Sequence, residues 1–346
     1  MTQSKTATSA SDLPLEPHTI MTTTHLDTTL RINGARLWDT LMQQASIGAT
    51  PKGGVRRLAL TDLDRQGRDF FVAQAEAAGC TVRVDAIGNV FARRPGRNNA
   101  LPPVMTGSHI DTQPTGGKFD GNYGVFAGIE VVRTLNDAGI ETEAPIEVAV
   151  WTNEEGSRFV PVMMGSGAFI GEFTLDAVLA AQDRDGVTVG EALRSIGYAG
   201  TEAVGGRQVG AYFEAHIEQG PVLEAHATTI GVVTGALGQR WYDVVLTGME
   251  AHAGPTPMEL RRDALLPAAE LVGIANRIAL ERPPHARATV GCLMDLYRQA
   301  SALGGSLRLV GVQKRVETML TMTGAQNFLQ MHADEATALK GLGASR

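Results

Sequence analysis

The sequence predicts an α/β fold, a sheet with helices on its faces. Patterns typical of amphipathic helices alternate along the chain with short apolar runs typical of strands. Clusters of His, Asp and Glu directly follow two of these runs, and ligands of such sheets bind at the strand ends. The chain has 346 residues, which at roughly 150 residues per domain is enough for about two domains.

The expected elements begin at Leu30. A first helical pattern includes Leu30 and Leu37, and a second helix starts at Thr61 in a capping-box arrangement and ends near Gly79. A strand pair is expected over residues 81–94, where apolar residues alternate around a Gly-Asn step.

Further along, a strand is expected over 102–111, a helix over 122–139 and a strand over 146–156. After about residue 237 the pattern changes. A strand over 241–249, an amphipathic helix over 261–281 and a strand over 288–293 predict a small α+β unit, inserted in the first domain or appended to it.

Composition excludes several classes of protein. The net charge of −7 does not fit a nucleic-acid-binding surface, which needs clustered basic residues. The two cysteines, Cys80 and Cys292, make neither a disulfide framework nor a CxxC metal pair, so a reducing cytoplasm is expected. Residues 1–26 are rich in Ser and Thr without the apolar core of a secretory signal, and we expect a disordered tail there and no membrane association.

Four short clusters carry the side chains suited to chemistry, at residues 108–111, 118–122, 153–156 and 214–220. Imidazole and carboxylate groups are ligands for zinc and similar divalent ions, and one carboxylate can bridge two ions. Each cluster alone also fits a surface pair or a solvated turn. Together, beside a glycine-rich loop, they indicate a site.

Four segments carrying these clusters resemble the hydantoinase/carbamoylase family of dinuclear metal amidohydrolases, within the M20 metallopeptidase group. They are GSHIDTQPTGGKFDGNYGV, WTNEEGSRF, EAHIEQGPVLE and GMEAHAGPTPMELRRDAL. The resemblance runs from about Leu30 to Leu293 and implies a metallopeptidase-like catalytic domain with a smaller α+β lid that forms a homodimer. We therefore expect a catalytic domain over 27–237, a partial lid over 238–294 and a segment without family resemblance over 295–346.

The resemblance also implies roles for the metal-ligating residues. His109 and Glu155 would belong to different metal ions, Asp120 would bridge them, and His216 would complete one coordination shell. Asp111 would orient the His109 ring, as carboxylates often do for metal-bound histidines. Zinc is the first expectation for both ions, while manganese, cobalt and nickel accept the same donors.

The remaining roles implied by the resemblance concern the reaction. Glu154 would be the general base, Gln219 would contact the substrate, and His252 would reach into the partner subunit's active site. The substrate would be a small ureido or amide compound, first of all an N-carbamoyl-L-amino acid, with allantoate and β-ureidopropionate left open.

The sequence departs from the family pattern after Leu293. It lacks the family's Asn-containing strand, its Arg-bearing strand and the late Gly-His-Asp motif, and His332 has no glycine-rich context. A reading-frame change or deletion near codon 293 is our hypothesis for this segment. An inactive truncated homologue therefore stays open beside the amidohydrolase.

Overall fold

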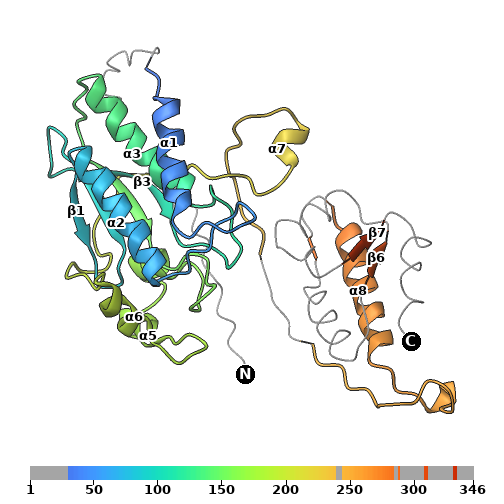
Figure 1. Cartoon of the computed structure of the whole chain (residues 1–346). Helices are drawn as coiled ribbons and strands as arrows, with labels where there is room; N and C mark the ends of the chain where they lie inside the picture. Colours follow the sequence, from blue (N-terminus) through green and yellow to red (C-terminus); the bar gives the residue numbers. More distant parts are fainter. Residues whose placement is uncertain (1–29, 239–243, 284–286, 289–307, 311–329, 333–346) are drawn as a thin grey trace, which may run out of the picture.

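The computed structural model describes residues 30–238, 244–283, 287–288, 308–310 and 330–332 (Figure 1). The predicted tail over 1–26, most of the predicted strand over 288–293 and most of the segment 295–346 lie outside these residues. None of the described helices combines the length and the apolar character needed to cross a bilayer.

The core is a five-stranded sheet with the strand order β1-β2-β4-β3-β5. The strands β3, β4 and β5 are parallel neighbours, with His109 paired to Trp151 and Thr106 paired to Phe213. The strands β1 and β2 complete the sheet as antiparallel additions, which confirms the strand pair predicted over 81–94. The bounds are β1 Thr81–Val84, β2 Val90–Arg94, β3 Val104–His109, β4 Ile146–Trp151 and β5 Ala211–Phe213.

Three long helices, α1, α2 and α3, lie side by side over the sheet (Figure 1). In α1 the Asn33 side chain caps the first turn by accepting from the Arg36 amide, and in α2 the Thr61 hydroxyl accepts from the Asp64 amide. These helices and the strands β3 and β4 confirm the elements predicted between residues 30 and 151. The bounds are α1 Gly34–Ser46, α2 Asp62–Ala77 and α3 Asn122–Asp137.

Both faces of the central strand β4 are buried, as expected for a sheet with parallel strands. Val148 and Val150 point into the main apolar core under the helices. Ala149 and Trp151 point to the opposite face, into a smaller cluster with Phe91. The carboxyl ends of β3 and β4 therefore emerge from a rigid layer.

The remaining described elements are short, apart from α8, which confirms the helix predicted over 261–281. In contrast, residues 244–249 are irregular, so the strand predicted over 241–249 is wrong for the part that is described. A strand needs a hydrogen-bonded neighbour, and no described strand pairs with these residues. The bounds are α4 Met164–Ile170, α5 Leu175–Ala180, α6 Val189–Ile196, α7 Val222–Ala225, η1 Met258–Leu260, α8 Leu265–Leu280, β6 Arg308–Val310 and β7 Gln330–His332.

Candidate metal centre

The polar clusters meet because three parallel strands end at one edge of the sheet. His109 is the last residue of β3, Glu154 follows β4 by three positions, and His216 follows β5 by three positions. Asp120 joins them from the loop that leads into the N-terminus of α3. The predicted convergence at the strand ends is therefore present.

His109 is buried and presents one nitrogen to the centre of the site. Its Nδ1 lies 2.9 Å from the backbone carbonyl oxygen of Asp111. Because a carbonyl oxygen only accepts, Nδ1 carries the hydrogen and Nε2 keeps a free lone pair in the neutral ring. Nε2 lies 3.4 Å from Glu154 Oε2 and 4.0 Å from Asp120 Oδ1.

Asp120 faces both histidines. Its Oδ1 lies 3.3 Å from His216 Nε2, and one donor atom from each of His109, Asp120 and His216 falls within 4.8 Å of the others. Asp120 Oδ1 is buried without a hydrogen-bond partner, while Oδ2 accepts a 2.6 Å hydrogen bond from Gln219. An orphaned carboxylate oxygen between two imidazole nitrogens fits a divalent cation.

Asp111 contacts both the His109 ring and the turn that follows β4. Its carboxylate accepts the backbone N–H groups of Glu154 and Glu155, at 3.2 Å each. Its Oδ1 lies 3.8 Å from His109 Nδ1, while its backbone carbonyl oxygen makes the 2.9 Å contact with the same nitrogen. Asp111 therefore fixes the turn that carries the two glutamates.

The two glutamates occupy different environments. Glu154 stays about one-third exposed, with Oε2 near the His109 ring. Glu155 accepts a hydrogen bond from Gln113 through Oε2, while its Oε1 is buried without a partner. The structure thus brings His109, Asp120 and His216 together, and it leaves Glu155 beside that triad with one free acceptor.

Gly121 allows Asp120 and His109 to approach closely. Its φ of +64° favours glycine, and a Cβ at this position would lie 2.5 Å from the His109 ring. The glycine next to Asp120 is therefore required by both backbone conformation and space.

Hydrogen bonds outside the candidate ligand set hold His216 and its segment in place. Its Nδ1 lies 2.8 Å from the Ile217 carbonyl oxygen, which directs Nε2 toward Asp120. Glu214, two residues earlier, accepts hydrogen bonds from Ser108 and from Tyr212. These bonds tie the segment carrying His216 to the end of β3, and the sequence clusters contain Ser108 and Glu214 without indicating this pairing.

The acidic surroundings favour positive charge in the site. The neighbouring Asp120 carboxylate raises the pKa of His216 to about 9. Burial raises the pKa of Asp111 to about 6 and also raises that of Glu155. Burial works against the charged form of Asp120 too, but the two imidazoles outweigh it and its pKa is lowered. His216 therefore carries a positive charge at neutral pH beside the ionised Asp120 carboxylate.

Two residues with predicted roles in the reaction lie in contrasting positions. Gln219 reaches the centre, where its amide donates to Asp120. His252 lies in an exposed segment and accepts a hydrogen bond from the Gly254 amide, and no described contact joins it to the candidate metal-ligating residues.

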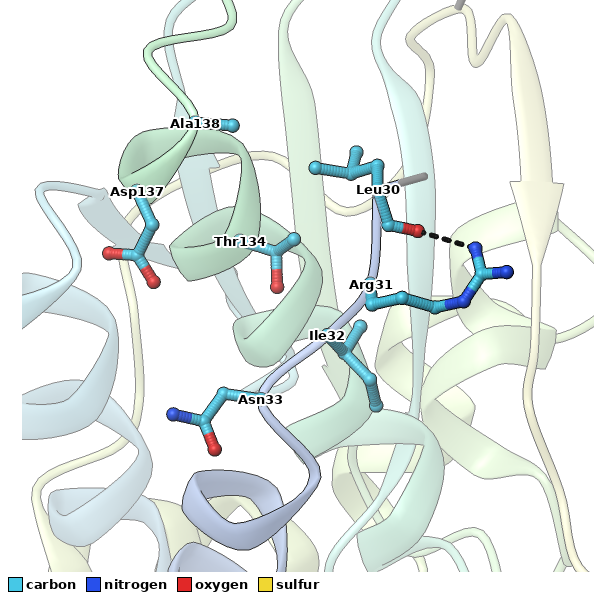
Figure 2. Close-up of a pocket in the computed structure, with 7 residues that line it drawn as sticks. All are labelled: Leu30, Arg31, Ile32, Asn33, Thr134, Asp137 and Ala138. Carbon is cyan, nitrogen blue, oxygen red and sulfur yellow. Dashed lines mark hydrogen bonds between the residues drawn. The ribbon is translucent and has the colours of Figure 1, made fainter. Parts of the chain in front are cut away.

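A surface hollow lies far from this centre, at the opposite end of α3 (Figure 2). Its Thr134 and Asp137 are separated from Asp120 by most of the helix, about 20 Å at 1.5 Å per residue. Residues up to 29, which directly precede Leu30 in its lining, lie outside the described part of the chain. The lining consists of Leu30, Arg31, Ile32, Asn33, Thr134, Asp137 and Ala138.

Comparison with known proteins gives a consistent picture. The chain is 44% identical over 315 residues to an N-carbamoyl-L-amino-acid amidohydrolase of Rhizobium meliloti, covering 91% of this chain and 76% of that protein. It is 30% identical over 301 residues to an allantoate amidohydrolase of Bacillus subtilis, covering 86% of this chain and 71% of the relative.

Among solved structures, the chain is similar to a hydantoinase/carbamoylase family amidase of Burkholderia multivorans. The TM-score is 0.68 at 63% identity, and the match covers 74% of this chain and 62% of the other. The chain thus spans less than two thirds of that solved chain.

The sequence model of Peptidase family M20/M25/M40 matches residues 105–343. This range holds all the candidate metal-ligating residues described above, and it continues past Leu293, where the motifs recognised in the sequence stop. The chain therefore belongs to Peptidase family M20/M25/M40, in its hydantoinase/carbamoylase branch.

Proposed function

We propose that this protein is a metal-dependent amidohydrolase that cleaves a linear C–N bond in N-carbamoyl-L-amino acids. The observation that carries the proposal is the meeting of His109, Asp120 and His216 beside the partly exposed Glu154 carboxylate. The name of the Rhizobium meliloti relative supports the substrate class.

The ligand set consists of His109, Asp120, Glu155 and His216. Asp120 would bridge two ions, His109 and Glu155 would hold different ions, and His216 would complete one of the two ligand sets. The unpartnered Oδ1 of Asp120 and Oε1 of Glu155 support these assignments. Two divalent ions, zinc first and manganese, cobalt or nickel as alternatives, would supply Lewis acidity toward the substrate carbonyl.

Glu154 transfers the proton between the attacking water and the departing nitrogen of the substrate. Its Oε2 takes a proton from the attacking water and returns it to the departing nitrogen, the work of a general base and then a general acid. Asp111 accepts a hydrogen bond from the Glu154 amide, and this anchoring keeps the Glu154 carboxylate near His109 Nε2. The partial exposure of Glu154 leaves room for substrate on its open side.

Gln219 and His252 complete the proposed machinery. Gln219 contacts the substrate from its position beside Asp120. His252, in the lid domain over 238–294, reaches the active site of a second subunit, and its exposed position fits that role. We propose a homodimer on this ground, a small-molecule substrate and a cytoplasmic location, with neither nucleic acid nor membrane as a partner.

Metal analysis and turnover assays test the proposal together. The purified chain, loaded separately with Zn²⁺, Mn²⁺ or Co²⁺, should bind two equivalents and release ammonia from N-carbamoyl-L-amino acids. N-carbamoyl-D-amino acids serve as the matched control, with allantoate and β-ureidopropionate as the alternative substrates. Less than one equivalent of metal with no turnover would contradict the proposal and favour an inactive homologue.

A further inference from the structure

We propose that Arg57 is a positioning residue that holds two ligand-bearing loops of the metal centre in register. One, the His109 loop, covers residues 109–112 and begins with His109 at the end of β3, and the other, the Asp120 loop, precedes α3 and carries Asp120. The inference rests on the metal centre of the proposed function and adds a residue that lies outside the ligand set.

The Arg57 guanidinium is fully buried, and its hydrogen-bond acceptors belong to three separate segments. Nε donates to the Ile110 carbonyl at 2.9 Å, and Nη2 donates to Asn122 Oδ1 at 2.7 Å. Nη1 donates to the carbonyls of Gln44 and Ile47 at the end of α1, at 3.1 and 2.7 Å. Carbonyl and amide oxygens accept all of these hydrogen bonds, so they satisfy the donors of this buried cation. The carboxylates of Asp64 and Asp111 also favour its positive charge, without a hydrogen bond to it among the described residues.

Each of the first two bonds reaches a metal ligand through one residue. Ile110 lies between His109 and Asp111, so the Nε bond fixes the backbone that sets both side chains. Asn122 donates to the Asp120 backbone carbonyl from its side chain, at 2.8 Å, and from its amide, at 2.6 Å. One planar group therefore sets the spacing between the His109 loop and the Asp120 loop.

The main chain of Arg57 adds two more bonds to the same loop. Its amide donates to Thr112 Oγ1 at 2.8 Å, and its carbonyl accepts from the Thr112 amide at 2.9 Å. The segment over 109–112 is thus held by both the backbone and the side chain of one residue.

Gly67 in α2 is an independent sign that the molecule makes room for this guanidinium. A Cβ at Gly67 would lie 2.8 Å from Arg57 Cδ and 3.1 Å from Nε. Glycine is disfavoured inside a helix, so its presence here is explained by the passage of the arginine side chain across that face.

A lysine at position 57 could not make the same set of hydrogen bonds. The guanidinium presents its donors in a planar fork that reaches four acceptors at once, whereas an ammonium group is a point donor. Burial lowers the pKa of Arg57 to about 10, so the group stays protonated at neutral pH.

Two measurements on the full chain test the proposal, with Arg57→Lys, Arg57→Met and Gly67→Ala as variants. Zinc affinity, from competition with a chelating dye, should weaken by about 10- to 100-fold in Arg57→Lys, the range for residues that orient metal ligands. In the metal-free Arg57→Lys chain, hydrogen exchange should be faster than in the wild type over residues 107–123. Gly67→Ala keeps the arginine but displaces its side chain, so it should also weaken zinc affinity and speed up exchange, each by a smaller amount.

Arg36→Gln is the matched control, because Arg36 joins α1 to Glu130 and Asp137, far from the ligands along α3. It should lower the melting temperature while leaving zinc affinity unchanged. Wild-type zinc affinity and exchange rates in Arg57→Lys would overturn the proposal. If the wild-type chain bound no zinc, the proposed function would fail, and hydrogen exchange would still decide the role of Arg57.

Discussion

Asp120 Oδ1 lies 3.3 Å from His216 Nε2, within ion-pair distance. Since His216 Nδ1 faces the Ile217 carbonyl, a neutral His216 would turn a lone pair toward a carboxylate oxygen. Two acceptors this close repel each other unless a positive charge is shared between them. Protonation of the imidazole supplies that charge, and a cation bound at the proposed metal centre would replace it.

Metal affinity should therefore rise with pH. His216, with its pKa raised to about 9, must lose a proton before Nε2 can bind a metal. We expect the apparent dissociation constant for zinc to fall about tenfold per pH unit between pH 6.5 and 9. Titrations with a competing chelator, corrected for its own protonation, measure this slope. His216→Asn should bind more weakly and with a shallower slope, and an equal slope would refute the assignment.

The raised pKa of His216 also predicts that the stability of the metal-free chain depends on pH. A histidine whose folded pKa is raised from 6.5 to about 9 stabilises the fold fully below pH 6.5, and this contribution is lost as the pH rises through 9. Urea unfolding of the chelator-treated protein at pH 6 and pH 9 checks the sign. The His216→Asn variant should lose less stability over that interval.

Asp120→Asn should reduce the metal content. The neutral amide cannot bridge two cations, so we expect at most one equivalent of zinc where the wild-type chain binds two. Elemental analysis after gel filtration gives the number, and circular dichroism checks the fold. Asp39→Asn, an exposed change on α1, is the control. Two retained equivalents in Asp120→Asn would show that another group bridges the ions.

Glu154→Gln should separate metal binding from turnover. The amide keeps the shape of the side chain but cannot accept a proton, so we expect kcat to fall about 10²- to 10⁴-fold with metal content unchanged. Glu155→Gln provides the contrast, because it should lower the metal content itself. Ammonia release near the wild-type rate from Glu154→Gln would assign the general base to another residue.

Gly121→Ala and Gly139→Ala form a matched pair at the two ends of α3. Both glycines have φ near +64°, but only the Cβ at Gly121 meets His109, while nothing lies within 4 Å at Gly139. Gly139→Ala should cost about 1 kcal/mol from backbone strain, and Gly121→Ala about 2 to 4 kcal/mol from strain and overpacking. Denaturant unfolding compares them. An equal loss of unfolding free energy in the two variants would mean that the His109 ring moves aside without an energetic cost.

Much of the catalytic layer was predictable from residue order. The helix starting after Thr61 and the strands ending at His109 and Trp151 follow from capping and apolar runs, which are local properties. The short helix α6 was missed, although Thr188 and Glu191 form a complete capping box there. The strand expected over 241–249 failed over its described residues because strand formation depends on a partner and not on propensity alone.

Residue types mark the His, Asp and Glu clusters as a candidate site, because the chemistry of a donor group belongs to the residue itself. The resemblance of the motifs to the hydantoinase/carbamoylase family then names His109, Asp120, Glu155 and His216 as the expected ligands. The groups that hydrogen-bond to the segments carrying these ligands are set by the tertiary structure. The Asp111 carboxylate holds the amides of Glu154 and Glu155 from more than 40 positions away, and Arg57 reaches Asn122 across 65 positions. Such distances close only when the sheet and helices pack, so the tertiary structure decides how the ligands are held in place.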